Sequence, residues 1–290
     1  MIFLEIATIK QRFGFVIIAC LGVLITAWMP TAQATVITLA EGNSEAQIDI
    51  DGNTKGKGTG MFSWKIDGID HLAQQWFWYR VGNNAEASID TLTLSSFSNP
   101  IPNFLFSTYS GAGFTISIYY TLVGGAAGSL TGDIAETIVI SNTGASPLDF
   151  HFYQYTDFNL GGDADDDLVA FVNSNTFTQI DQSVAFSENV VAPAPIYHEA
   201  ALFNATLNRL NDGVATTLND NDSIGPGNLT YTWQWDVTLA KKGSPGSSVV
   251  ISKDKHISHS PEPGSFLLLV TGLVGFAILA YRRKKRNSRL

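Results

Sequence analysis

The clearest pattern along the chain is a strict alternation of apolar and polar residues. Over 230–239 every second side chain is apolar, and threonines, Gln234 and Asp236 are among the residues between them. The apolar set is Tyr231, Trp233, Trp235, Val237 and Leu239. Segment 115–122 alternates in the same way, with isoleucines, a tyrosine and a leucine on one side. A period of two is typical of a β-strand with one buried face, so both segments are predicted to be half-buried strands.

Segment 74–80 has a different pattern. Trp76 and Trp78 would share one face of a strand, and Phe77 and Tyr79 the other. Aromatic rings on both faces predict a strand that is covered on each side, because large rings are a main filling of β cores. A platform for stacking sugar rings is the alternative interpretation.

Turn-forming residues separate these segments, as at 124–125, 142–144, 161–162 and 225–227. Helical periodicity is weak, and 199–210 is the best candidate for a short helix. Residues 35–255 are numerous enough for one large domain with its own core. We therefore predict an all-β fold, a large antiparallel β-sandwich, with a mutarotase-like supersandwich as one form of it.

The first 34 residues have the features of an export signal. Lys10 and Arg12 precede an apolar stretch over 13–28, and the small residues of 32–34 precede Thr35. This order is typical of a secretory signal peptide cleaved by signal peptidase. Segment 17–20 could instead be a lipoprotein box acylated at Cys20, although the apolar stretch continues beyond it. Cleavage before Thr35 would leave no cysteine, so stability would come from packing rather than disulfides.

The other end of the chain predicts a membrane anchor. An apolar run over 266–281 is slightly shorter than a usual transmembrane helix. Cations beside such a segment keep that end in the cytoplasm. The cations begin the basic tail 282–290 and are Arg282, Arg283, Lys284, Lys285 and Arg286.

Just before this helix the chain reads Pro261, Glu262, Pro263. A Pro-Glu-Pro motif, a glycine-containing apolar helix and a terminal basic cluster together resemble the PEP-CTERM sorting signal of Gram-negative bacteria. The resemblance covers only the end of the chain, within a linker and sorting region over 256–290. It implies processing by exosortase after transient anchoring in the inner membrane. It also implies delivery to the cell surface or extracellular matrix, in association with biofilm exopolysaccharide.

Charge narrows the range of partners. The whole chain has a formal net charge of −9. Residues 35–260 contain 9 Lys and Arg against 24 Asp and Glu, which leaves −15. This balance argues against nucleic acid, whose phosphates need cationic partners. It suits a self-repelling exported protein or one that holds cations.

The best polar constellation is in segment 150–158. Strand alternation would place His151, Tyr153, Tyr155 and Asp157 on one face. Such a row could line a carbohydrate groove or transfer protons. It could equally be a solvated face with cross-strand hydrogen bonds.

An acidic turn follows, in which Asp163, Asp165 and Asp167 occupy every second position. Hard oxygen ligands recur in this way in calcium loops. Leu168 and Ser174 stand where an EF-hand would have Gly and Glu, so a solvated acidic turn is the alternative. No other cofactor is expected.

Recognisable catalytic motifs are missing from the sequence: it has no serine nucleophile elbow, His-Glu-x-x-His zinc site or phosphate loop. His198 with Glu199, or His151 with Asp157, could supply acid–base groups. The main expectation is a non-catalytic surface or matrix protein associated with polysaccharide, and therefore no enzyme. The alternative is a secreted carbohydrate-active enzyme, hydrolase or mutarotase-like, that uses the same export route.

Overall fold

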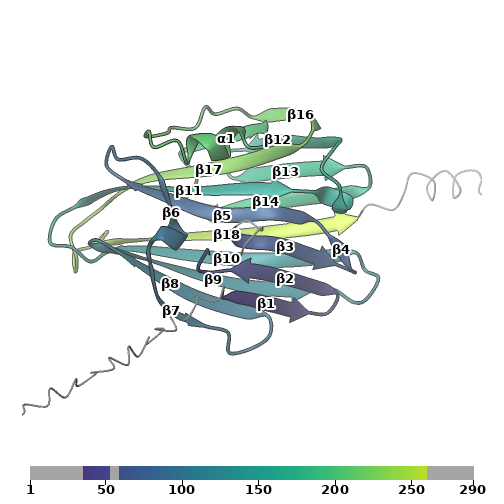
Figure 1. The fold of residues 1–290 in the computed structure, drawn as a ribbon, viewed down its shortest axis with the longest axis horizontal. Helices are drawn as coiled ribbons and strands as arrows, with labels where there is room; N and C mark the ends of the chain where they lie inside the picture. The colour runs from purple at the N-terminus through teal and green to yellow at the C-terminus, as the bar shows by residue number, and fades with distance from the viewer. Residues whose placement is uncertain (1–34, 53–58, 260–290) are drawn as a thin grey trace, which may run out of the picture. The chain divides into compact units, whose positions relative to one another are not determined.

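Two nine-stranded antiparallel sheets form the body of the protein (Figure 1). The computed structural model describes residues 35–52 and 59–259. Sheet A has the order β1 (Val36–Glu41), β2 (Ser44–Asp49), β3 (Gly60–Ile66), β5 (Leu72–Val81), β11 (Leu148–Phe158), β17 (Leu229–Leu239) and β15 (Tyr197–Leu202). The short strands β4 (Ile69–Asp70) and β6 (Ala87–Ser88) pair with β3 and β5.

Sheet B packs against one face of sheet A, here called the inner face. Its order is β16 (Ser223–Gly227), β12 (Asp167–Asn173), β13 (Thr176–Asp181), β14 (Val184–Ala192), β18 (Ser248–His259), β10 (Thr131–Asn142), β9 (Phe114–Gly124), β8 (Phe104–Gly111) and β7 (Thr93–Ser98). The helical elements are α1 (Ala205–Arg209) and the 3-10 turns η1 (Ile89–Thr91) and η2 (Leu160–Gly162). The predicted all-β architecture of antiparallel sheets is confirmed.

Aromatic side chains fill much of the space between the sheets. Phe152 of β11 lies opposite Tyr79 on one side and Trp235 on the other. Its ring stacks on Phe77 at 5.3 Å and lies 6.1 Å from Trp235. Burying a large apolar side chain contributes about 1.5–3 kcal/mol, so these central strands hold a large part of the core energy.

The predicted strands are present. Segment 115–122 lies in β9, where buried and half-buried residues alternate as expected. In β17 the apolar face is buried, but its polar face is buried too: Thr230, Thr232 and Gln234 are fully inaccessible. The prediction of a half-buried strand is therefore wrong for β17, because segment 204–218 covers its other face. Segment 74–80, predicted to be covered on both sides, is so in β5.

Two predicted boundaries differ from the structure. The helix expected over 199–210 is wrong: strand β15 continues to Leu202, and α1 has only five residues. Pairing with β17 outweighs local helix preference there. The body was predicted to end at 255, but β18 pairs with β10 and β14 up to 258–259.

Several predictions concern residues outside the described part of the chain. They are the signal peptide over 1–34 with Cys20, the motif 261–263, the segment 266–281 and the basic tail. Among residues 35–52 and 59–259, no helix is long and apolar enough to cross a membrane.

Candidate functional site on the outer face of sheet A

Antiparallel pairing brings polar residues from three strands together on the outer face of sheet A. His151 of β11 lies opposite Arg80 of β5 and Asp236 of β17. The next position on this face, Tyr153, pairs with Trp78 and Gln234. Tyr155 begins a further row across the sheet, with Trp76 on one side and Thr232 and Glu199 on the other. Asp157 forms the last row, between Gln74 and Thr230. The register therefore places the predicted set His151, Tyr153, Tyr155 and Asp157 on one face, as alternation indicated.

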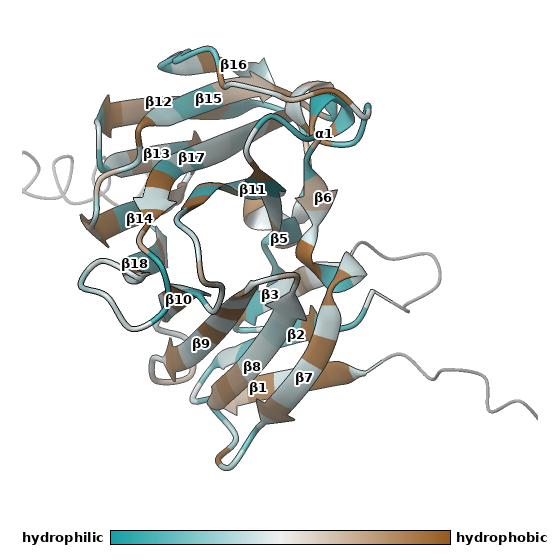
Figure 2. Cartoon of the chain, turned by 90° about the vertical axis from the view of Figure 1, so that its left-hand side faces the viewer, coloured by the Kyte–Doolittle hydropathy of each residue, from teal (hydrophilic) through white to brown (hydrophobic). Residues whose placement is uncertain are grey.

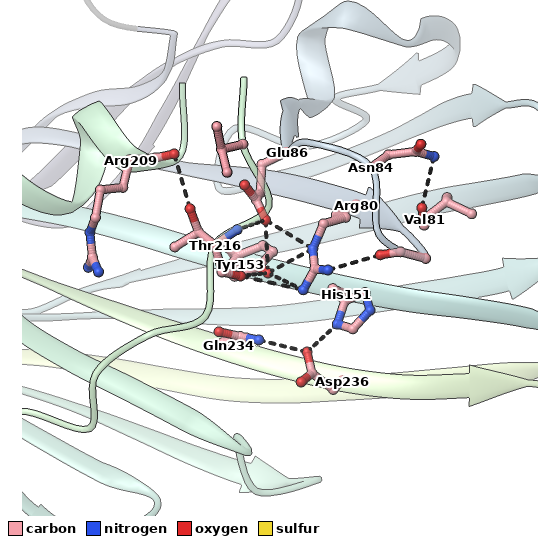
Figure 3. A network of polar contacts seen from close by, with 12 residues as sticks. Arg80, Val81, Asn84, Glu86, His151, Tyr153, Arg209, Thr216, Gln234 and Asp236 are labelled. Atoms are coloured by element: carbon pink, nitrogen blue, oxygen red, sulfur yellow. Dashed lines mark hydrogen bonds and ion pairs between the residues drawn. The ribbon is translucent and has the colours of Figure 1, made fainter. Parts of the chain in front are cut away.

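An ion pair organises the centre of this face (Figure 3). Arg80 Nε lies 3.0 Å from Glu86 Oε1, and both side chains are almost completely buried. Arg80 also donates to the Tyr153 hydroxyl at 3.1 Å and to the Gly82 carbonyl at 2.9 Å. The Tyr153 hydroxyl lies 3.1 Å from Glu86 Oε1. Burial raises the pKa of Tyr153 above its usual value, although Arg80 opposes the shift, so the phenol stays protonated and serves as a donor.

Segment 204–218, which includes α1, covers this face. Figure 2 shows α1 and β6 on the side of sheet A away from sheet B. Trp78 Nε1 donates to Asn211 at 3.2 Å, and Tyr153 donates to the Thr216 carbonyl at 2.8 Å. The backbone N–H of Leu218 donates to Gln234 at 2.9 Å. Polar side chains of the strands thus supply the hydrogen bonds of the irregular cover, which explains their burial.

At one end of the face lies His151, whose side chain is 12% exposed and whose Nε2 atom is buried. The Nδ1 atom of His151 lies 2.6 Å from Asp236 Oδ1, and Gln234 donates to the same oxygen at 2.9 Å. Because a carboxylate only accepts, Nδ1 carries a proton, and in the neutral imidazole Nε2 is then the acceptor. No group among the described residues hydrogen-bonds to that Nε2. Its nearest charged neighbour is Asp149 at 3.5 Å, whose side chain is 60% exposed.

The opposite end holds buried polar atoms without hydrogen-bond partners in the described part of the chain. They are the Tyr155 hydroxyl, Asp157 Oδ1 and Thr232 Oγ1. Burial raises the pKa of Asp157 to about 7, and it also raises that of Tyr155. Asp157 is therefore poised between its neutral and charged forms near neutral pH.

The two acid–base pairs considered from the sequence are not formed. His198 and Glu199 project to opposite faces of β15: His198 packs 4.2 Å from the Phe171 ring, and Glu199 bonds to Thr206 and Arg209. His151 and Asp157 share a face but are six residues apart, about 20 Å along a strand. Neither pair can pass a proton directly.

The acidic turn does not present three equivalent carboxylates. Asp163 and Asp165 are exposed, whereas Asp167 is in β12 and fully buried. Burial raises the pKa of Asp167 to about 7. Within 35–52 and 59–259, no group of three or more His, Cys, Asp or Glu side chains is placed to hold a metal ion. Calcium binding at Asp163, Asp165 and Asp167 stays a prediction.

The sequence interpretation missed Arg80, Glu86 and Asp236. Arg80 is a lone cation at the end of the aromatic run 76–79, and a buried strand can keep such a charge only beside a partner. That partner, Glu86, follows in the loop after β5. Asp236 was assigned to the polar face of β17, but only the register shows that it faces His151.

Comparisons with known proteins identify solved structures with a similar arrangement of strands. No protein-family model matches the chain, and no curated protein matches it. Among solved structures, a bacterial glucoamylase complexed with acarbose has a TM-score of 0.54 at 11% identity, over 83% of this chain and 36% of its own. A GalM/aldose epimerase homologue from C. elegans has a TM-score of 0.47 at 10% identity, over 79% of this chain and 100% of its own. A galactose mutarotase-like protein from Lactobacillus casei has a TM-score of 0.43 at 9% identity, over 77% of this chain and 100% of its own.

The likeness to the glucoamylase shows a shared fold, and the chain spans about a third of that enzyme's length. The expectation that this protein is no enzyme is contradicted by the finding that a glucoamylase shares its fold. That expectation rested on the lack of recognisable sequence motifs. Catalytic groups that come from separate strands of a sheet leave no local motif, so this lack excludes little.

Proposed function

We propose that the protein is an exported carbohydrate-active enzyme that transfers protons to and from a sugar. The observation that carries the proposal is the His151–Asp236 pair. Its Nδ1 is held at 2.6 Å by Asp236, while Nε2 has no hydrogen-bond partner among the described residues. A histidine oriented by a carboxylate through one nitrogen is a general acid–base group at the other.

In the proposed reaction the exposed Asp149 side chain moves aside, and His151 Nε2, which is buried in the free protein, takes the proton of a sugar hydroxyl. Asp236 positions the ring and stabilises the imidazolium that forms. Asp149, 3.5 Å from Nε2 and exposed to solvent, is the second titratable group at this point. Interconversion of anomers needs proton removal at one oxygen and delivery at another, which two neighbouring groups can share.

Arg80, Glu86 and Tyr153 support this end of the face without reacting. Their hydrogen bonds are made among themselves and to the covering segment. They fix β5 and β11 beside His151, so the imidazole is held on rigid strands rather than on a loop. Carbohydrate is the substrate class to test first, because a glucoamylase solved with acarbose has the same fold.

The experiment follows the change of optical rotation of freshly dissolved α-D-glucose and α-D-galactose with the purified full chain. Acceleration above the buffer rate is expected for at least one sugar. His151→Gln should reduce this acceleration by about 100-fold or more, the usual contribution of a general acid–base group.

The chain offers a matched control. His256 on sheet B also pairs with an aspartate, since its Nδ1 lies 2.7 Å from Asp133, but this pair is on the other sheet. His256→Gln should keep the wild-type rate. No acceleration by the wild-type protein, or equal losses in the two variants, would contradict the proposal.

We also propose that the terminal signals deliver this enzyme to the cell surface or extracellular polysaccharide through exosortase processing. The support is the order of motif, apolar segment and cations over 261–286. Replacing Pro261, Glu262 and Pro263 by Ala should leave export intact and keep the full-length chain in the inner membrane. A processed band on a gel, unchanged from wild type, would refute the sorting mechanism and leave the enzymatic proposal standing.

A further inference from the structure

Four oppositely charged side chains lie between the two sheets, and we call them the charge cluster: Glu136, Glu188, Lys253 and Lys255. They project from β10, β14 and β18, which are neighbours in sheet B. Their side chains are 0% exposed, apart from 1% for Lys255. No mechanism described above uses these residues.

Lys253 is at the centre of the charge cluster. Its Nζ lies 2.5 Å from Glu136 Oε2 and 3.2 Å from Glu188 Oε1. Lys255 contacts the other oxygen of Glu136, and its Nζ lies 3.3 Å from Glu188 Oε1. Glu136 and Lys253 are also direct cross-strand partners in the β10–β18 ladder.

The charge cluster is almost completely shielded from solvent. The ring of Phe77 lies 5.2 Å from Lys253 Nζ, and Gln154 and Tyr231 donate hydrogen bonds to Glu188. Removing four ions from water costs several kcal/mol each, and their mutual attraction only partly offsets this cost. A reaction that turns one ammonium and one carboxylate into a neutral amide would relieve it.

We propose that Lys253 and Glu136 condense to a side-chain amide that joins β18 to β10. Lys253 passes one proton to the Glu136 carboxylate, and the free Nζ then attacks Glu136 Cδ. The tetrahedral adduct loses a second nitrogen-bound proton to Glu188, which returns it to the departing hydroxyl. One C–N bond forms, one C–O bond breaks and one water leaves, so no other reactant is needed.

The other two members of the cluster have defined roles in this step. Lys255 contacts the second Glu136 oxygen, where negative charge develops in the adduct, and stabilises it as a fixed cation. Glu188 is held by hydrogen bonds from Gln154 at 2.8 Å and from Tyr231, both in sheet A. It is therefore positioned to accept and return the proton.

The acid–base balance of the cluster favours these assignments. Burial holds the pKa of Lys253 below its usual value despite the two glutamates, which makes the neutral amine more accessible. For Lys255 burial acts in the same direction, but the glutamates outweigh it and raise its pKa. Burial alone would raise the pKa of Glu188, yet the two ammonium groups lower it, so Glu188 stays ionised and has a free site for a proton.

The closeness of Lys253 and Glu136 would accelerate their condensation. Groups held in reacting geometry behave as though their concentration were about 10⁵ M or higher. Cross-strand pairing holds Lys253 and Glu136 in this way as soon as the sheet has formed. The only cysteine of the chain is Cys20, so no disulfide can join strands within the described body, and the amide would be its covalent brace.

Mass spectrometry of the denatured full-length protein tests the proposal. The mass should be lower than that of the unmodified chain by one water molecule. A digest should contain a branched peptide that joins the segments with Glu136 and Lys253, and trypsin should not cut after Lys253. Linear peptides that carry free Lys253, or a branch through Lys255 instead, would overturn it whatever the total mass.

Variants separate the chemistry from folding. Lys253→Arg should lose the branched peptide, and Glu188→Gln should lose most of it although both bonding partners remain. Lys65→Arg changes a lysine in an exposed pair with Glu45 (3.8 Å) and should keep the wild-type branch. Circular dichroism shows which variants fold, and full cross-linking in folded Glu188→Gln would refute the role of Glu188. None of these outcomes depends on the sugar chemistry proposed above.

Discussion

The outer faces of the two sheets have similar polar residues but very different environments. On sheet B, hydroxyl groups pair across strands near solvent, as between Thr108 and Ser117 at 2.9 Å. On sheet A, Thr232 and Gln234 are fully buried beneath segment 204–218. One face is therefore a surface and the other a second, polar core. Whether a polar strand position is buried depends on which other segment of the chain covers it, however distant that segment is in sequence.

The largest effect is expected from breaking the apolar core that both sheets share. Trp235→Asp places a charge where a ring is 1% exposed and packs against Phe152. The free energy of unfolding should fall by more than about 4 kcal/mol, which combines a lost ring with a buried charge. Denaturant unfolding followed by fluorescence measures it, and wild-type stability would mean that this ring is solvent-exposed.

The polar core of sheet A should be nearly as sensitive. Arg80→Met leaves Glu86 buried without its cation and should cost about 4 kcal/mol. Adding Glu86→Gln to this variant should restore part of the stability, because the uncompensated charge disappears. A double variant that is no more stable than Arg80→Met would show that the ion pair is not what organises this face.

The pH dependence of stability tests the burial of Asp157 on the outer face of sheet A. Asp157 has a pKa of about 7 when folded and an ordinary value when unfolded. Between about pH 4 and 7 the Asp157 carboxyl is ionised in the unfolded chain but still protonated in the folded one. The free energy of unfolding should therefore fall by about 3 kcal/mol over this range, and below pH 4 this loss is absent. Asp167 titrates in the same direction. Asp157→Asn should remove about half of the combined loss in unfolding experiments at pH 5 and pH 8, and an unchanged slope would contradict the burial of this carboxyl.

The smallest effect comes from a matched pair of hydroxyl deletions. Thr232→Val removes a buried hydroxyl without a hydrogen-bond partner among the described residues and should stabilise the protein by about 1 kcal/mol. Thr137→Val on the half-exposed face of β10 should change stability by less than about 0.5 kcal/mol. Equal changes in the two melting temperatures would remove the distinction between the faces.

How much of this could be read from the sequence depends on the range of the interactions involved. Alternation predicted the strands and the shared face of His151 and Tyr153, because both follow from local backbone geometry. It could not show that Thr232 would be covered, since the cover comes from segment 204–218. The pairing of His151 with Asp236 depends on the register between two strands that are far apart in the chain.

The sequence contains a signal from which the charge cluster could have been predicted. Glu136 lies between Ile134 and Ile138, at a position where the alternation of β10 demands an apolar residue. Lys253 and Lys255 interrupt the apolar face of β18 in the same way. Charges of opposite sign on the buried faces of different strands predict a buried ionic group, although not which lysine meets which glutamate.

The place of β18 in sheet B also sets the order of events in the life of the protein. This strand is the last one in the described part of the chain, yet it lies between β14 and β10 in the middle of its sheet. Until residues 248–259 are available to pair, sheet B is two separate halves with open edges, and its core is not closed. Contacts of such long sequence separation form late in folding. The two halves of sheet B therefore join, and its core closes, only when the last strand of the body takes its central place.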